Sequence, residues 1–285
     1  MFSDHDIARY YDVSEVHYRR IWQLDKSRSL HYGYWDASTK NFHEALLNIN
    51  KVLSGLAAIN EHDRVLDAGC GIGGSSLWLG SHKHCRVTGI SLSAKQVATA
   101  NALANKEELD SLVNFETLDY ISTGYPDASF DVVWAIESVC HAGDKNLFIK
   151  EAFRLLKPGG RLIIADFFKQ PGLTGQDARM IADWAHGWAV DDFVSLDIFK
   201  DMLLAAGFKV SNINNATTAI RPSAKRLYLA YFPGALLGFF YRLFHRGATE
   251  FGKKNVSTAY LQYRSLLKNL WQYHIVLAHK LGEEN

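Results

Sequence analysis

The sequence predicts an α/β protein built on a doubly wound sheet of seven mostly parallel strands. From residue 64 onward, short apolar runs alternate with longer amphipathic stretches, which is the pattern of successive βαβ units. A glycine-rich turn at residues 69–74 directly follows the first of these runs and opens a helical stretch, as at the ligand-binding end of such sheets. Hydrophobic residues make up 48% of the 285, enough to cover both faces of the sheet.

The alternating runs give the expected order of elements. Strands are expected at residues 64–67, 86–90, 113–116, 130–134, 161–165, 209–211 and 273–278. Helices are expected between them at residues 75–80, 94–105, 145–156 and 196–205. Pro158, Gly159 and Gly160 end the third of these helices, because proline cannot continue it and the glycines permit a tight turn into the next strand.

The regions around this core give the expected domain organisation. Residues 1–60 are expected to form a helical cover at one edge of the sheet, and residues 61–285 to form the main domain. Two late insertions, at about residues 170–195 and 216–268, interrupt the alternation. The first is expected to be irregular and contains Trp184 and Trp188. We expect the insertions to cap the carboxyl ends of the strands, largely with helices.

Charge and cysteine content exclude several classes of partner. Lys plus Arg total 31 against 30 Asp plus Glu, so a net charge of +1 provides no field to attract nucleic acid. Cys70, Cys85 and Cys140 lack the spacing of a metal site or a disulfide framework, so no metal is expected and a reducing cytoplasm is the expected compartment. The amino terminus has no secretion signal, and the longest uncharged run, residues 227–241, is shorter than the roughly 20 residues of a membrane-spanning helix.

The glycine-rich turn is the first candidate for a binding site. Gly69, Gly71 and Gly74 satisfy the dinucleotide-binding pattern, which would suit a nicotinamide-dependent oxidoreductase. Two features oppose that interpretation. Asp67 ends the first strand two residues before the first glycine, and Ser91 ends the second strand where a dinucleotide site has an acid for the ribose.

Three motifs in order resemble one enzyme family. Residues 65–73 resemble the first motif of class I S-adenosylmethionine-dependent methyltransferases. Asp119, followed by Tyr120, resembles the acid that accepts a hydrogen bond from the adenine amino group, and residues 155–160 resemble the motif before the fifth strand. The resemblance implies a Rossmann-like methyltransferase fold, S-adenosyl-L-methionine as cofactor and S-adenosyl-L-homocysteine as product. It implies that the methionine part of the cofactor lies along a loop whose binding candidates are Asp67, Gly69, Cys70 and Gly71.

The ribose contacts depart from the family pattern. Many members end the second strand with an acid that binds both ribose hydroxyls, whereas Ser91 stands there in this chain. Residues 89–93 followed by Gln96 are similar to the subset that contains tocopherol, cyclopropane fatty acid, sterol and prenyl-diphosphate methyltransferases. In that subset backbone groups and a glutamine can supply the bonds, so Ser91, Leu92 and Gln96 are the candidates here. The alternative is that Gln96 is only a solvated helix residue.

The stretch after the fourth strand holds the catalytic candidates. Residues 134–142 resemble the corresponding stretch of sterol methyltransferases. Glu137 could stabilise a carbocation formed when an alkene attacks the methyl group, or remove a proton afterwards, and His141 could act as the base for a phenol or an amine. Two alternatives stay open: Glu137 orients the cofactor or a backbone amide, and His141 caps or lines the cleft.

An aromatic loop near the amino terminus is the remaining motif. Tyr32, Gly33, Tyr34 and Trp35 resemble the segment with which these small-molecule enzymes close over the cofactor. Electron-rich rings attract a sulfonium by a cation–π interaction of roughly 0.5–2 kcal/mol. Tyr32 is therefore a cofactor-binding candidate and Tyr34 a catalytic one. The alternative is that these rings pack an edge of the core.

Taken together, the motifs predict an enzyme that transfers the methyl group of S-adenosyl-L-methionine to a hydrophobic small molecule. Carbon methylation of an isoprenoid, sterol-like or prenylated aromatic acceptor is the first expectation. The alternatives are O- or N-methylation of a specialised metabolite with His141 or His186 as base, and a non-catalytic cofactor-binding protein. Residues 227–246, with basic flanks, are expected to form a lid over the acceptor or a peripheral membrane contact, and a homodimer is left open.

Overall fold

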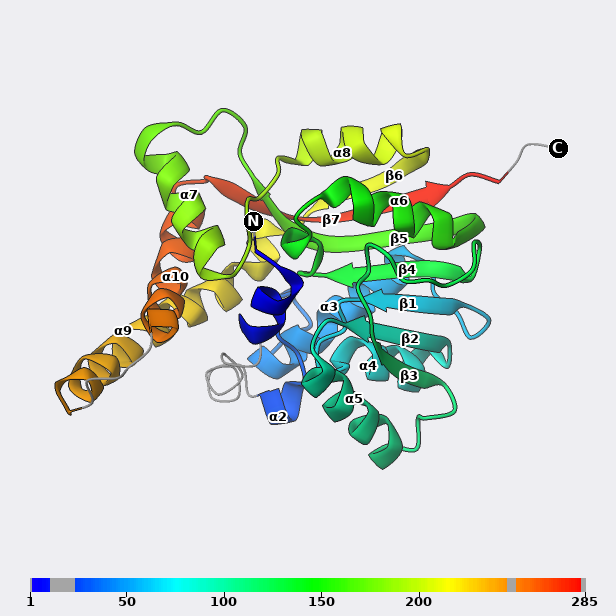
Figure 1. Cartoon of the computed structure of the whole chain (residues 1–285), viewed down its shortest axis with the longest axis horizontal. Helices are drawn as coiled ribbons and strands as arrows, with labels where there is room; N and C mark the ends of the chain where they lie inside the picture. Colours follow the sequence, from blue (N-terminus) through cyan, green and yellow to red (C-terminus); the bar gives the residue numbers. More distant parts are fainter. Residues whose placement is uncertain (1, 11–23, 245–249, 283–285) are drawn as a thin grey trace.

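The predicted seven-stranded sheet forms the centre of the molecule (Figure 1). A computed structural model describes residues 2–10, 24–244 and 250–282. The strand order is β3-β2-β1-β4-β5-β7-β6, in which β7 is antiparallel to both of its neighbours and the other pairs are parallel. The strands are β1 (Arg64–Ala68), β2 (Arg86–Ser91), β3 (Val113–Thr117), β4 (Phe130–Ile136), β5 (Leu156–Lys169), β6 (Phe208–Asn215) and β7 (Trp271–Lys280).

The strand β5 differs most from its expected bounds. The apolar run that predicts it covers residues 161–165, yet the strand extends from Leu156 to Lys169. Residues 158–160, which were expected to form a turn, lie within the strand, because Leu156 already pairs with Phe130 of β4. From Arg161 opposite His279 to Lys169 opposite Trp271, the strand is paired with β7. This pairing joins segments about a hundred residues apart, so the local pattern could not reveal it. Asp166 stays in the strand because its carboxylate is buried and hydrogen-bonded, as described below.

Helices cover both faces of the sheet, as the doubly wound prediction requires. One face packs against α3 (Phe42–Leu56), α4 (Gly74–Lys83) and α5 (Ala94–Lys106), and the other against α6 (Lys145–Leu155) and α8 (Leu196–Ala205). A short helix α2 (Leu24–Ser27) precedes α3, and residues 4–10 are also helical. Four of these helices begin at a polar side chain that accepts a hydrogen bond from the first turn. These N-cap residues are Asn41, Ser93, Asp144 and Ser195.

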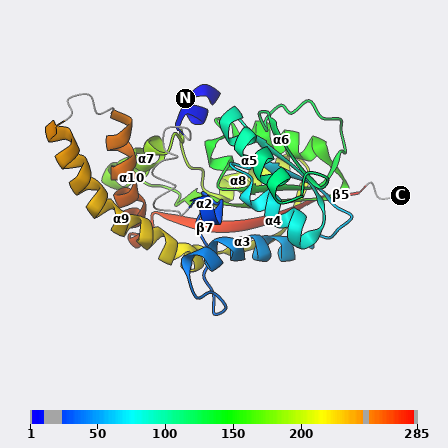
Figure 2. The same cartoon turned by 90° about the horizontal axis from the view of Figure 1, so that it is seen from below.

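The late insertions form helices at the end of the sheet where the parallel strands finish. They are α7 (Gly175–Gly187), α9 (Thr217–Phe244) and α10 (Glu250–Leu267), and α10 contacts both of the others. The expected irregular structure of the first insertion is therefore wrong. Ile181, Trp184 and Ala185 give α7 one buried side, which the polar residues between them conceal in the sequence. Figures 1 and 2 show α9 and α10 projecting from this end as a helical pair.

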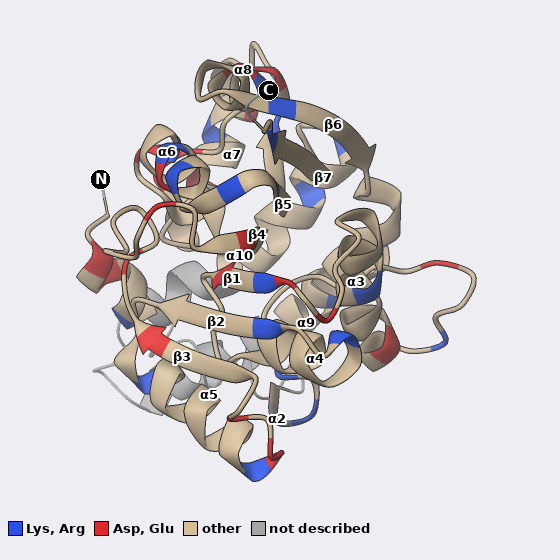
Figure 3. Ribbon diagram, turned by 90° about the vertical axis from the view of Figure 1, so that its right-hand side faces the viewer, with Lys and Arg blue, Asp and Glu red and all other residues tan. Residues whose placement is uncertain are grey.

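The strand order places a crevice-forming switch point between β1 and β4, because the chain leaves β1 toward β2 on one side and reaches β4 on the other. Acidic and basic residues are interspersed along the elements visible in Figure 3. Within the described residues, none of the helices combines the length and the apolar character that a membrane-spanning segment needs.

Candidate active site

The loops that follow β1 and β4 touch each other at the switch point. Gly69 has a φ of 90°, and a Cβ built on it would lie 2.4 Å from Cβ of Ser138. The Ser138 hydroxyl donates a hydrogen bond of 2.6 Å to the carbonyl of Ala68, which holds the two loops together. A glycine is required at position 69 both for its left-handed conformation and for this close approach. The candidate loop at residues 69–71 is thus fixed directly beside the loop that carries Glu137 and His141.

Asp67 lies buried beneath the glycine-rich loop. Its Oδ2 accepts a hydrogen bond of 2.6 Å from the Ser76 hydroxyl, in the first turns of α4. Burial raises the pKa of Asp67 to about 7, and the Ser76 bond partly offsets this effect. The carboxyl group therefore joins the end of β1 to the helix that the glycine-rich turn opens.

The ends of β2 and β3 present two polar groups on the cofactor side. The Ser91 hydroxyl donates to Oε1 of Gln96 at 2.9 Å, which leaves the Gln96 amide nitrogen as the outward donor. Oδ1 of Asp119 accepts from the Ile121 backbone at 3.0 Å, and burial raises the pKa of Asp119. Oδ2 of Asp119 has no hydrogen-bond partner among the described residues. Ser91 thus contacts Gln96, and Leu92 is half-buried beside it; the ribose contacts of these three candidates stay a prediction.

Tyr120 connects the loop after β3 with the loop after β4. Its hydroxyl donates to the Ser138 carbonyl at 3.0 Å, and its ring meets Phe148 of α6 edge to face. The cofactor-binding candidates at residues 119–120 and the catalytic candidates at residues 137–141 therefore share one hydrogen-bonded assembly.

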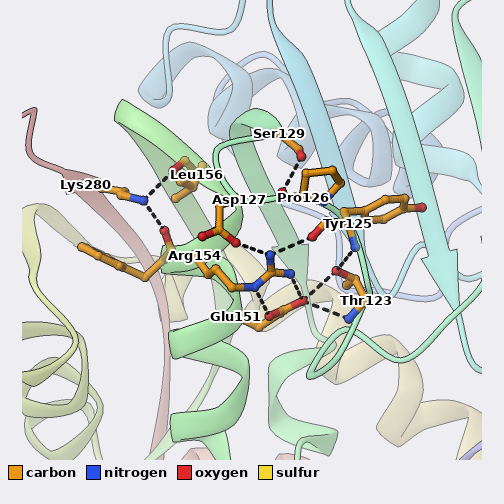
Figure 4. A network of polar contacts seen from close by, with 10 residues as sticks. Thr123, Tyr125, Pro126, Asp127, Ser129, Glu151, Arg154, Leu156 and Lys280 are labelled. Carbon is orange, nitrogen blue, oxygen red and sulfur yellow. Dashed lines mark hydrogen bonds and ion pairs between the residues drawn. The ribbon is translucent and has the colours of Figure 1, made fainter.

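A charged network anchors the rest of the loop after β3 to α6 (Figure 4). The Arg154 guanidinium donates to Glu151, to the Tyr125 carbonyl and to Asp127. The Glu151 carboxylate also accepts from the backbone and the hydroxyl of Thr123, at 2.9 and 2.7 Å. These bonds lower the pKa of Glu151 and keep its charge in place. The network holds in position the segment that leads from residues 119–120 back to the sheet.

Glu137 is the junction between the aromatic loop and the sheet. Its Oε1 accepts from the Tyr32 backbone at 2.8 Å and from the Tyr273 hydroxyl at 2.9 Å. Glu137 has a φ of 50°, an uncommon conformation for a residue with a side chain, and burial raises its pKa to about 8. The Tyr32 hydroxyl donates in turn to Gln262 of α10 at 2.8 Å. The structure therefore assigns to Glu137 a contact with a backbone amide, as one alternative from the sequence expected.

The aromatic loop is pinned to α3 and α9 by its backbone. A Cβ at Gly33 would lie 2.8 Å from the Ala45 backbone, so only glycine fits there. The Ser223 hydroxyl accepts from the Gly33 amide at 3.1 Å and from the Trp35 indole at 2.9 Å. Tyr34 is half-buried and packs against the core, and its proposed catalytic role stays a prediction.

His141 lies in the loop after β4 with a defined tautomer. Its Nδ1 contacts the Ala189 carbonyl at 3.3 Å, and because a carbonyl only accepts, Nδ1 carries the proton and Nε2 is the acceptor nitrogen. Burial lowers the pKa of His141 to about 4, so the imidazole is neutral at physiological pH. Asp166 supports the same loop by accepting from the Cys140 amide at 2.9 Å, and burial raises the pKa of Asp166 to about 6.

Three of these residues were not among the sequence candidates. Tyr273 and Gln262 gave no local signal, because both belong to segments far from the motifs in the chain. Asp166 could have been found from its position, since an acid that directly follows an apolar strand is expected to be buried and bonded.

The tryptophans of the first insertion belong to a buried aromatic cluster. Trp184 is fully buried and packs against Phe167, Phe193 and Trp271, and Trp188 contacts Tyr32 at 6.3 Å between ring centroids. His186, on the same helix, is exposed. Its ring lies against Phe2 with centroids 4.8 Å apart, so the structure does not bring it into the buried cluster.

The segment 227–246 is described in part. Leu229 and Phe232 are exposed, and the ring of Tyr228 packs against those of Tyr260 and Tyr263 of α10. The basic flank at Arg246 lies outside the described residues, so the lid and the membrane contact stay predictions. No group of three or more His, Cys, Asp or Glu side chains in the described part of the chain could hold a metal ion.

The comparisons with known proteins agree with this arrangement. A methyltransferase domain matches residues 66–164. The chain is 37% identical to 27-O-demethylrifamycin SV methyltransferase of Amycolatopsis mediterranei over 218 residues, which cover 76% of this chain and 79% of that protein. It is 36% identical to 2-methyl-6-phytyl-1,4-hydroquinone methyltransferase of Synechocystis over 166 residues, which cover 57% of this chain and 51% of that protein.

Solved structures of other methyltransferase-like proteins share the fold. A crystal structure of a mycolic acid cyclopropane synthase with S-adenosylhomocysteine superposes with a TM-score of 0.83 and 17% identity, covering 98% of this chain and 99% of the other. This likeness concerns the fold, a seven-stranded and mostly parallel sheet with helices on both faces. The chain belongs to the class I S-adenosylmethionine-dependent methyltransferases and is an enzyme that uses S-adenosyl-L-methionine as its methyl donor.

Proposed function

We propose that this enzyme methylates a hydroxyl oxygen of a large hydrophobic small molecule, and that His141 accepts the hydroxyl proton. The observation that carries the proposal is a neutral imidazole of fixed tautomer in the loop that touches the glycine-rich turn. The match to 27-O-demethylrifamycin SV methyltransferase covers 79% of that protein, and its name refers to a methyl group on oxygen. The name of the second relative refers to a prenylated hydroquinone. Both names describe large hydrophobic acceptors.

The polar atoms at the sheet end suit the cofactor. In this proposal the Gln96 amide nitrogen donates to the ribose, and Oδ2 of Asp119, which has no hydrogen-bond partner among the described residues, accepts from the adenine amino group. A Cβ built on Gly71 would meet, among the described residues, only the Leu30 side chain at 3.7 Å, which supports an approach of the methionine part to this backbone. When bound there, S-adenosyl-L-methionine supplies an electrophilic methyl group and leaves as S-adenosyl-L-homocysteine.

The chain's own contribution is to orient the acceptor and take up one proton. The acceptor oxygen forms the new bond to the methyl carbon and gives its proton to Nε2 of His141. The hydroxyl becomes strongly acidic as the oxygen gains positive charge, so a base with a pKa of about 4 is sufficient. The same low pKa keeps the imidazole unprotonated, and therefore competent, throughout the neutral range.

Carbon methylation of an isoprenoid, the first expectation from the sequence, is the second candidate. Its support is the buried Glu137 carboxyl on the same loop, which could stabilise a developing carbocation if it ionised. Two donors already occupy one of its oxygens, and burial raises its pKa to about 8, so the neutral form predominates near neutrality. This commitment of Glu137 is why we place oxygen before carbon.

The test combines product analysis with a matched pair of variants. Purified enzyme is incubated with methyl-labelled cofactor and a panel of hydrophobic acceptors whose hydroxyl groups are free or blocked. We expect label in an ether or ester of the free hydroxyl compounds, and a fall in kcat of about 10²–10⁴-fold in His141→Ala. The matched control is His186→Ala, which removes an exposed histidine and is expected to keep kcat. Label bound to carbon, or full activity of His141→Ala, would contradict the proposal.

A further inference from the structure

A buried cation lies at the start of α6. Lys145 is 6% exposed, and its ammonium donates to three backbone carbonyls: Cys140 at 3.1 Å, Ala142 at 2.8 Å and Asp192 at 3.2 Å. An ammonium has three donors, so its hydrogen-bonding capacity is fully used. A cation in the first turn opposes the helix dipole, and burying it costs solvation. Helix stability therefore does not explain the residue at this position.

The three carbonyls belong to the two segments that hold His141. Cys140 and Ala142 flank the histidine in the chain. Asp192 lies three residues after Ala189, whose carbonyl contacts Nδ1 of the imidazole. One ammonium thus ties the loop after β4 to the segment that follows α7, and both of these contact the same imidazole ring. Movement of either segment would displace Nε2 from the acceptor.

Lys145 also contributes a positive charge near the imidazole of His141. Acidic groups from several elements face the Lys145 ammonium. Burial lowers the pKa of Lys145, and these groups oppose that effect. These groups are Asp166 on β5, Asp191 and Asp192 after α7, and the Cys140 thiol in the loop after β4. Asp166 accepts from two backbone amides, Asp191 accepts from the Phe2 amide, and Asp192 is paired with Lys169. Lys145 repels the protonated form of His141, and this repulsion adds to burial in opposing protonation of the ring.

We propose that Lys145 is a positioning residue for His141, because its ammonium clamps the two segments that hold the imidazole. The charge of the ammonium adds to burial in opposing protonation of the ring. The consequence for catalysis rests on the proposed function, in which neutral His141 accepts the hydroxyl proton. Lys145 touches neither the acceptor nor the cofactor in this proposal. It acts only through the place and the protonation state of His141.

The experiment compares Lys145→Met, which removes the charge at similar length, with Lys150→Met on the same helix, where the lysine is exposed. The full-length enzyme is saturated with S-adenosyl-L-homocysteine, and the His141 ring is titrated by NMR. In Lys145→Met we expect the titration midpoint to rise, because the repulsion is lost. The acidic limb of the kcat profile should shift upward by the same amount. Lys150→Met should match the wild type in both measurements.

The outcomes separate this inference from the proposed function. An unchanged His141 midpoint in folded Lys145→Met overturns the inference. A raised midpoint without any response of methyl transfer supports the action of Lys145 on His141 and overturns the role of His141 as base.

A second variant keeps the test decisive if Lys145→Met does not fold. Lys145→Arg keeps the charge but cannot place three donors on the same carbonyls. We expect a midpoint close to that of the wild type together with an acceptor KM at least threefold higher, because the clamp is displaced (roughly 0.6 kcal/mol or more). Wild-type values of both KM and kcat in Lys145→Arg would overturn the positioning role.

Discussion

Replacement of Glu137 by glutamine tests the protonation state on which the site depends. Oε1 of Glu137 accepts from the Tyr32 amide and the Tyr273 hydroxyl, and a glutamine carbonyl can accept both bonds. The substitution therefore keeps the contacts and removes only the ability to ionise. Burial raises the pKa of Glu137 from 4.5 to about 8.

The sign of the effect follows from proton binding. The folded protein holds this proton more tightly than the unfolded chain, so wild-type stability is highest below pH 4.5 and falls as the pH rises toward 8. Each unit of pH in that window costs up to about 1.4 kcal/mol, so the loss between about pH 5.5 and about pH 8 is of order 3 kcal/mol. Glu137→Gln has no such loss. Its free energy of unfolding relative to the wild type should therefore rise by about this amount across the window.

Urea unfolding of the cofactor-free protein at the two pH values measures the difference. Asp67 also has a raised pKa, but it contributes equally to wild type and variant and cancels. Asp166 repels the ionised Glu137, so its change in the variant is part of the measured difference. Glu108→Gln, at an exposed glutamate, is the control and should show a difference from wild type that is independent of pH. If Glu137→Gln gains nothing between the two pH values, Glu137 is already ionised in the folded protein and the reasoning is refuted.

Three other substitutions probe the same assembly. Gln262→Leu removes the acceptor of the buried Tyr32 hydroxyl and should lower the free energy of unfolding by about 1–3 kcal/mol in urea titrations; an unchanged value would mean that water replaces the bond. Asp119→Asn retains the Oδ1 contact but presents an amide to the adenine amino group. Calorimetry should therefore show binding of S-adenosyl-L-homocysteine weakened about tenfold. Equal affinity would mean that Asp119 does not bind the adenine. Gly69→Ala forces a Cβ to within 2.4 Å of Ser138 at a φ of 90°. We therefore expect the free energy of unfolding to fall by about 2 kcal/mol or more, with loss of cofactor binding. A stable variant that still binds the cofactor would contradict the packing described.

The sequence predicted the sheet and the cofactor loops because their signals are local. Each strand and the main helices follow from apolar runs and N-cap residues within a few positions of one another, and the glycine-rich turn must follow β1 directly. Gln96 and Asp119 were chosen on the same local ground, since they lie within six residues of the strand ends that carry them, and their cofactor contacts stay predictions. The helical nature of the first insertion was missed because only one side of α7 is apolar and its ends carry glycines.

What the tertiary structure decided is how the catalytic candidates are held. The partners of Glu137 lie 105 and 136 residues away in the chain, and the Tyr32 hydroxyl meets Gln262 across 230 residues. No local pattern encodes such pairings, since they arise only when β7 inserts beside β5 and α10 packs against the aromatic loop. The protonation states of Glu137 and His141 belong to the same category, because burial that folding alone creates sets their pKa values. The sequence by itself thus determined the fold and the methyl donor, whereas long-range packing decided which groups contact Glu137 and His141 and how deeply folding buries them.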